Sequence, residues 1–160
     1  MADLKTLKQA KQAYNTLCSM LDNRQWKYSK NEEDLSIECR VQGDDIPMNI
    51  FFQIDTDHSL INLYSHLDVE VPKEKLVETA VAVNIINSVL VDGSFDYNIL
   101  KGNILFRLTS SYKSSLISEK AFEYILDVSC STVDQYNDKL DALIKGEYSL
   151  SDLYILTHGE

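Results

Sequence analysis

The segment Asp55-Thr56-Asp57-His58 comes closer than any other part of the chain to a metal-binding loop. A calcium loop also needs a glycine at its sharp turn and a later glutamate that binds the ion through both oxygens, and this segment has neither. Aspartate between two strands mostly stabilises the turn itself. We therefore expect a turn at this position and no metal site.

The three cysteines and three histidines predict no catalytic site. A cysteine nucleophile needs a base held close to the thiol. Cys18 and Cys39 lie on the apolar sides of a predicted helix and strand, as small hydrophobic residues do, and Cys130 has no histidine near it in the sequence. The cysteines are far apart and form no Cys-x-x-Cys pair, which argues against a disulfide framework and a zinc site. The histidines, at positions 58, 66 and 158, share no metal-binding spacing.

The glycines are isolated in the sequence, so they form no glycine-rich loop that could bind phosphate. We accordingly predict a protein that is not an enzyme and that binds no cofactor and no metal.

Length and charge restrict the class of protein further. A chain of 160 residues predicts one domain, spanning residues 1–160, with a core of ordinary size. The net charge of −10 repels phosphate backbones, so we expect no nucleic-acid partner. The chain has no apolar segment approaching about 20 residues and no signal sequence, so we expect a cytoplasmic protein that does not bind membranes. Acidic residues concentrate between positions 31 and 71, including Glu32-Glu33-Asp34 and Asp44-Asp45.

Hydrophobic periodicity predicts one helix and then three strands in the first half of the chain. Apolar residues recur at helical spacing over about residues 3–22, and a short extended piece follows at Trp26 and Tyr28. Apolar and polar residues then alternate, as in half-buried strands, over residues 35–42, 48–54 and 60–66. Turns this short can join only antiparallel neighbours, so these strands form a meander.

A helix predicted from Lys73 to about Leu90 is the centre of the chain, because it carries no charge between Thr79 and Val91. One of its faces would rest on the sheet. The opposite face, where a monomeric protein usually carries charge, has the apolar stripe Ala82, Ile85 and Val89. This stripe predicts a dimer or partner interface. The alternative is that the first or the third helix covers it.

Two asparagines lie three residues apart on this apolar helix. A buried amide is costly unless it is hydrogen-bonded. Asn84 and Asn87 therefore either tie the helix to the sheet or to the turn at Gly93, or contribute specific contacts to an interface. We favour the structural role.

The second half of the chain predicts a hairpin and a long helix. Alternating residues 95–99 and 104–108 flank Lys101-Gly102-Asn103, and a helix capped by Ser118 runs to Gly146, with one more turn at residues 149–153. The predicted order is α-β-β-β-α-β-β-α. We expect an α+β fold of two layers, with the helices on one face of an antiparallel sheet.

This order, together with particular residues, resembles the YbjN family of bacterial sensory transduction regulators. The resemblance implies a fold like that of the class I chaperones of type III secretion, and a small regulatory or chaperone-like binding protein that is often a homodimer and has no known reaction. The residues that carry it lie at structural positions: Trp26, Tyr28, Val71-Pro72, Val83–Asn87, Gly93–Asp96, Gly102, Phe106-Arg107, Val133–Tyr136, Leu140, Leu143 and Gly146.

Two classes of function remain open at this point. The first is a non-enzymatic homodimer that binds another protein, either as a regulator or chaperone or as an immunity-type protein whose acidic surface blocks a toxin. The second is a sensor of a small ligand or a metal, or an enzyme, each of which needs a concave pocket with converging polar groups.

Overall fold

The computed structural model describes residues 4–113 and 117–159. Four α-helices, one short 3-10 helix and six strands make up these residues. In chain order they are α1 (Leu4–Asn23), β1 (Tyr28–Asn31), β2 (Ser36–Val41), β3 (Met48–Asp55), β4 (Leu60–His66), η1 (Lys73–Lys75), α2 (Leu76–Asn87), β5 (Ser94–Asn98), β6 (Asn103–Ser111), α3 (Glu119–Lys145) and α4 (Leu150–His158).

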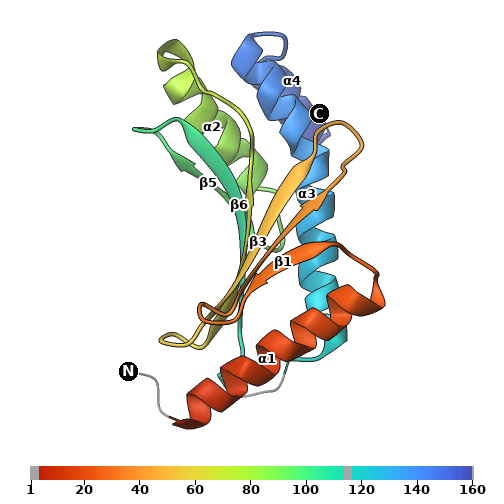
Figure 1. The fold of residues 1–160 in the computed structure, drawn as a ribbon. Helices are drawn as coiled ribbons and strands as arrows, with labels where there is room; N and C mark the ends of the chain where they lie inside the picture. The colour runs from red at the N-terminus through yellow and green to blue at the C-terminus, as the bar shows by residue number, and fades with distance from the viewer. Residues whose placement is uncertain (1–3, 114–116, 160) are drawn as a thin grey trace.

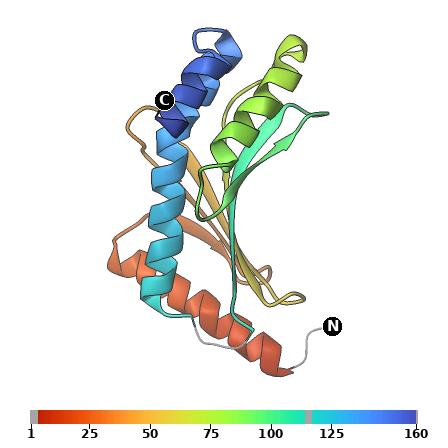
Figure 2. The same cartoon turned by 180° about the vertical axis from the view of Figure 1, so that it is seen from behind.

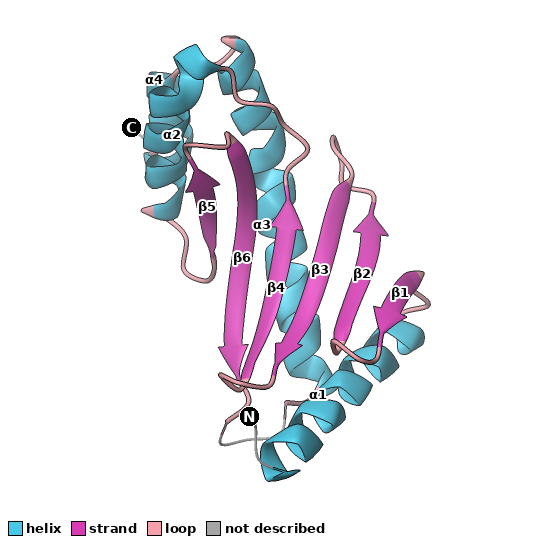
Figure 3. Ribbon diagram, turned by 60° about the vertical axis from the view of Figure 1, so that its left-hand side comes forward, coloured by secondary structure: helices cyan, strands magenta, loops and turns pink. Residues whose placement is uncertain are grey.

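The strands form one antiparallel sheet in the order β1-β2-β3-β4-β6-β5 (Figure 3). The predicted meander is therefore confirmed as β2, β3 and β4, and the predicted hairpin as β5 and β6. The hairpin joins the meander through β6, which pairs with β4. The extended piece expected near Tyr28 is a strand, β1, which pairs with β2 and makes one edge of the sheet.

The helices gather on one face of the sheet and leave the other uncovered, as the α+β prediction requires. Figure 3 looks onto the uncovered face, with α3 behind it. Figure 2 shows that α3 runs along most of the molecule and that α1 crosses near its first turns. At 27 residues, α3 is about 40 Å long. Its length lets it pack against β3, β4 and β6 as well as against α1 and α2 (Figure 1).

Alternating residues of the strands fill the core between the sheet and the helices. On β3 the buried positions are every second residue, from Met48 to Ile54. Phe52 meets Phe122 of α3 edge to face, with ring centroids 6.4 Å apart. Phe95 of β5 makes similar contacts with Phe106 at 5.2 Å and with Tyr136 at 6.2 Å. These aromatic contacts join both halves of the sheet to α3.

The boundaries of the central helix differ from the prediction. The segment begins with the 3-10 turn η1, and α2 ends at Asn87 rather than at Leu90. Gly93 has the expected left-handed conformation, with φ of +76°, but it lies directly before β5 rather than capping the helix. Ser118 caps α3 and Gly146 ends it in a left-handed conformation, as predicted.

The predicted final turn is a full helix, α4, of nine residues. Ser149 and Asp152 form a reciprocal capping box at its start, and Gly159 ends it in a left-handed conformation. α4 packs against α2.

Candidate functional site

The segment that resembled a metal loop is a turn between β3 and β4, as predicted. Asp55 accepts hydrogen bonds from the backbone N–H of Asp57 at 2.9 Å and of His58 at 3.0 Å. The Asp55 carboxylate also lies 2.8 Å from Nδ1 of His58, and this contact raises the pKa of the imidazole above its ordinary value. Burial raises the pKa of Asp55, but these hydrogen bonds outweigh it and leave the pKa below its ordinary value. Among the described residues there is no group of three or more histidine, cysteine or carboxylate side chains that could hold a metal ion.

The cysteines lie in surroundings that keep their thiols protonated. Burial raises the pKa of Cys39 to about 12 and that of Cys130 to about 11, and it raises the pKa of Cys18 as well. A thiol nucleophile needs the opposite shift, a lowered pKa.

None of the described helices is both long enough and apolar enough to span a bilayer.

Only part of the stripe predicted as an interface faces outward. Ala82 is fully buried within the chain and cannot contact a partner. The prediction that Ala82 belongs to an interface is therefore wrong. Ile85 and Val89 are half-buried, and Ile85 packs against the core. The prediction placed this stripe at the surface because it took the sheet as the main cover of the helix. In the structure α2 is covered on several sides, since β5, α3 and α4 all contact it.

The face of α2 that is open to solvent carries no charge. We call Val77, Val81, Asn84 and Ser88 the α2 outer surface; their spacing of three and four residues places them on one side of the helix. Val77 is 70% exposed and Val81 is 43% exposed. Valine is seldom placed at two successive exposed turns of a helix that faces only water.

Apolar residues of neighbouring elements are also exposed around α2. The tip of the β5–β6 hairpin lies against the start of the helix, since Gly102 packs on Val71 and Leu76, and this tip exposes Leu100. On α4, three consecutive residues are about half exposed: Tyr154, Ile155 and Leu156. The end of α4 lies next to the end of α2, where Nε2 of His158 is 3.5 Å from Oγ of Ser88.

The two asparagines of α2 have different roles. The side chain of Asn87 donates to the carbonyl of Phe95 at 2.9 Å and accepts from the N–H of Phe95 at 2.8 Å. Because β5 is an edge strand, Asn87 occupies the place that another strand would take. Asn84 is exposed on the α2 outer surface, and none of the side-chain hydrogen bonds found in the described residues involves it. The structural role predicted for both amides therefore applies to Asn87 alone.

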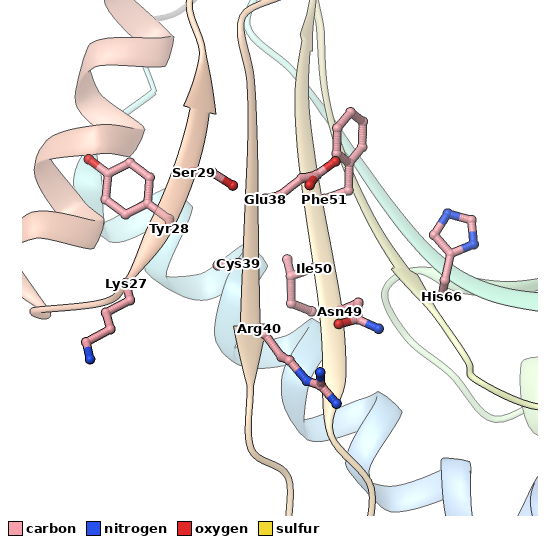
Figure 4. A pocket seen from close by; sticks show the side chains of 10 residues that line it. All are labelled: Lys27, Tyr28, Ser29, Glu38, Cys39, Arg40, Asn49, Ile50, Phe51 and His66. Atoms are coloured by element: carbon pink, nitrogen blue, oxygen red, sulfur yellow. The ribbon is translucent and has the colours of Figure 1, made fainter.

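A groove on the uncovered face of the sheet is a feature that the sequence reasoning missed. It has a volume of about 800 Å³, and its outer wall is the edge strand β1 (Figure 4). One feature of the sequence could have indicated this groove. The residues of β3 that face away from the core are polar at Asn49 and Gln53, but the position between them is the aromatic Phe51. Its ring stacks on Tyr64 of β4, with centroids 6.3 Å apart.

The acidic segment that begins at residue 31 is exposed at the two turns that flank β2. Glu33 and Asp34 lie in the β1–β2 turn, which Asn31 closes by accepting hydrogen bonds from their backbone N–H groups. In the β2–β3 turn, the N–H of Asp44 donates to Asp134 of α3 at 2.8 Å. These carboxylates form an acidic rim at opposite ends of β2 rather than one acidic site.

Solved structures with the same fold are known. The crystal structure of "YbjN, a putative transcription regulator from E. coli" superposes with a TM-score of 0.59, at 12% identity, over 82% of this chain and 92% of that one. The structure of the ExsC-ExsE complex gives 0.54, at 10% identity, over 80% and 92%. That of the HopA1-SchA chaperone-effector complex gives 0.52, at 11% identity, over 84% and 96%.

At the level of sequence, no curated protein matches the chain. A family model matches residues 14–142, from the middle of α1 to the last turn of α3. It is the model of YbjN, described as "Putative bacterial sensory transduction regulator". These matched residues include most of the chain, which therefore belongs to the YbjN family.

Proposed function

We propose that this protein is a homodimeric protein-binding module with a regulatory or chaperone-like role. Membership of the YbjN family supports a regulatory role, and neither the family description nor the names of the three similar structures denote an enzyme. Two of those structures are complexes with a second protein, ExsE in one and the effector HopA1 in the other. A fold that presents binding surfaces to other proteins accounts for these relationships.

The observation that carries the dimer is the α2 outer surface. An exposed row of valine and uncharged polar residues in a chain with 25% charged residues is typical of a surface that becomes buried on association. A stable dimer buries at least about 600 Å² on each protomer. A helix of 12 residues is only about 18 Å long, so one of its faces cannot supply that area. The interface must then extend onto the exposed apolar residues of α4 or onto the hairpin tip at Leu100.

Light scattering of the native protein tests the dimer. The wild type should have twice the mass of the chain, and Val81→Glu should give a folded monomer, because the carboxylate would lie unpaired in the interface. Val91→Glu is the matched control: Val91 is 97% exposed in the loop after α2, and this variant should remain a dimer. Ile85→Glu is less informative, because Ile85 packs against the core and its replacement also disturbs folding.

A wild type that is monomeric at every concentration would overturn the dimer. The protein-binding role is tested separately, by capturing partners from the native host on wild-type protein and reconstituting the complex from purified components. A partner that forms a complex of defined mass supports the role. If purified candidates form no such complex, the role is contradicted even for a dimeric protein.

The acidic rim supports a second candidate, an immunity-type protein that blocks a basic site on a toxin. Glu33, Asp34, Asp44 and Asp45 are exposed and could face such a site. The two candidates differ in their response to salt. Binding through the rim weakens steeply between low and physiological ionic strength, whereas binding through apolar surfaces does not.

A further inference from the structure

The uncovered face of the sheet is mostly polar, and an aromatic pair lies at its centre. The helices lie behind the sheet on the opposite face (Figure 3), and alternate residues of β3 are exposed or half-buried on this one. Phe51 and Tyr64 are opposite each other on β3 and β4, and their rings are stacked at an interplanar angle of 27°. Both are only half-buried. Exposed stacked aromatic rings on a strand face are suited to cover an apolar or aromatic side chain of a ligand.

The groove beside this pair has the shape of a channel along the strands. Its volume is about 800 Å³, and a second groove of about 370 Å³ shares Ser29, Glu38 and Phe51 with it. The residues of β2 that line the two grooves run from Ser36 to Arg40, a length of about 16 Å. A channel of this length suits an extended peptide better than a compact small molecule.

One end of the channel is basic, although the chain as a whole is acidic. Lys27 and Arg40 are exposed there, and neither takes part in any of the ion pairs between described residues. The arginine elsewhere on this face is neutralised, because Arg107 donates to Asp96 at 2.6 Å and 3.3 Å. Arg40 therefore keeps its guanidinium free for a partner.

The pairing of the strands places the donors and the aromatic rings in two parallel rows. Arg40, Asn49 and His66 are opposite one another on β2, β3 and β4 (Figure 4). The next row along the same strands contains Glu38, Phe51 and Tyr64, on β2, β3 and β4 in that order. Rows on one face are two residues apart, or about 6.6 Å. In an extended peptide, side chains on one face are also two residues apart, so a carboxylate would meet the donor row when an aromatic side chain covers the rings.

We propose that this channel binds an extended segment of a partner protein in which an acidic and an aromatic residue are separated by one residue. Arg40 and Asn49 hold the carboxylate, and Phe51 with Tyr64 receives the aromatic side chain. The proposal deepens the proposed protein-binding function and rests on it. It places the contact on β2–β4, which is separate from the α2 outer surface beside the far edge strand, β5.

Fluorescence polarisation with synthetic peptides tests the channel. The probe is fluorescein-labelled Gly-Ser-Glu-Ser-Phe-Ser-Gly, together with peptides in which the order of the two residues is reversed, glutamate is replaced by glutamine, phenylalanine is replaced by alanine, or the two residues are adjacent. We expect saturable binding of at least one order of the acidic and aromatic residues. The loss of either side chain, or of the spacing, should weaken binding at least about tenfold.

The protein variants separate the site from the overall charge. Arg40→Glu should weaken binding by about tenfold to a hundredfold, because it removes a charge-assisted contact and adds a repulsive one. Lys101→Glu changes the net charge by the same amount at the exposed hairpin turn, outside the channel, and should leave binding unchanged. Phe51→Ala should remove the preference for phenylalanine over alanine in the peptide.

Three results would overturn the proposal. The first is the absence of binding by every peptide. The second is equal weakening by Arg40→Glu and Lys101→Glu, which would show that only net charge matters. The third is competition by free phenylacetate as strong as that by the unlabelled peptide, which would identify a small-carboxylate pocket instead. Because Val81→Glu leaves the channel intact, peptide binding by that variant also distinguishes a failure of the channel from a failure of the dimer.

Discussion

The amide of Asn87 allows a quantitative test of how α2 is attached to the sheet. Replacing Asn87 with alanine removes two hydrogen bonds to the main chain of Phe95, of 2.9 and 2.8 Å. Each such bond contributes about 0.5–1 kcal/mol net, and leaving the N–H and C=O of a buried residue without partners adds about 1–2 kcal/mol in total. Phe95 is buried, so we expect Asn87→Ala to lower the free energy of unfolding by about 2–4 kcal/mol. For a chain of 160 residues, that is a fall in Tm of about 6–12 °C.

Asn84 provides the control, because it has the same side chain three residues earlier on the exposed face of the same helix. Alanine is the better helix former, so Asn84→Ala should change the free energy of unfolding by no more than about 0.5 kcal/mol. Urea unfolding of the three proteins measures the difference, and hydrogen exchange of the Phe95 amide reports the local loss. Equal destabilisation by the two substitutions, or unchanged exchange at Phe95, would refute the idea that Asn87 acts as a substitute strand.

Two further predictions concern a glycine and a histidine. Gly93→Ala should destabilise the fold by about 2–5 kcal/mol, because the added methyl group meets the ring of Phe106 at a residue that already has positive φ. Gly146 also has positive φ but has open space around it, so Gly146→Ala should destabilise the fold by only about 1–2 kcal/mol. Urea unfolding measures both changes. The His58–Asp55 pair should stabilise the protein fully between the unfolded pKa values of the two groups, at about pH 4–6.5. This stabilisation is lost as pH rises through the raised pKa of His58. It is also lost as pH falls through the lowered pKa of Asp55. An NMR titration should show the pKa of His58 falling in Asp55→Asn, and an unchanged titration would contradict the ion pair.

The strands and their order were predictable because their physical signal is local. Alternation of apolar and polar residues marks β2, β3 and β4, and the short turns between them leave only antiparallel pairing. β1 lacked such a signal, since its four residues show one half-buried side chain followed by three exposed ones. It becomes a strand through pairing with β2, which periodicity within its own residues cannot report.

The orientation of α2 could not be predicted for a related reason. Charged residues normally mark the solvent side of a helix, and α2 has none after Glu78. Without that marker, the stripe containing Ala82 and the row containing Val81 are equivalent in the sequence, although the first is buried and the second exposed. For the same reason, the sequence predicted one common role for Asn84 and Asn87. Only the position of Phe95, eight residues farther along the chain, distinguishes their roles.

The two proposed surfaces lie toward opposite edges of the sheet, and this has a consequence for binding. Association through α2, beside β5, would leave the channel near β1 and β2 open on both protomers. From β2 to β5 there are four strand spacings, or about 19 Å, so the two channels of a dimer would be about 40 Å apart. Spanning that distance takes at least about 12 residues of extended chain. A partner with two acidic-aromatic segments at this separation would bind both channels at once, so that weak contacts at each channel combine into a stable complex.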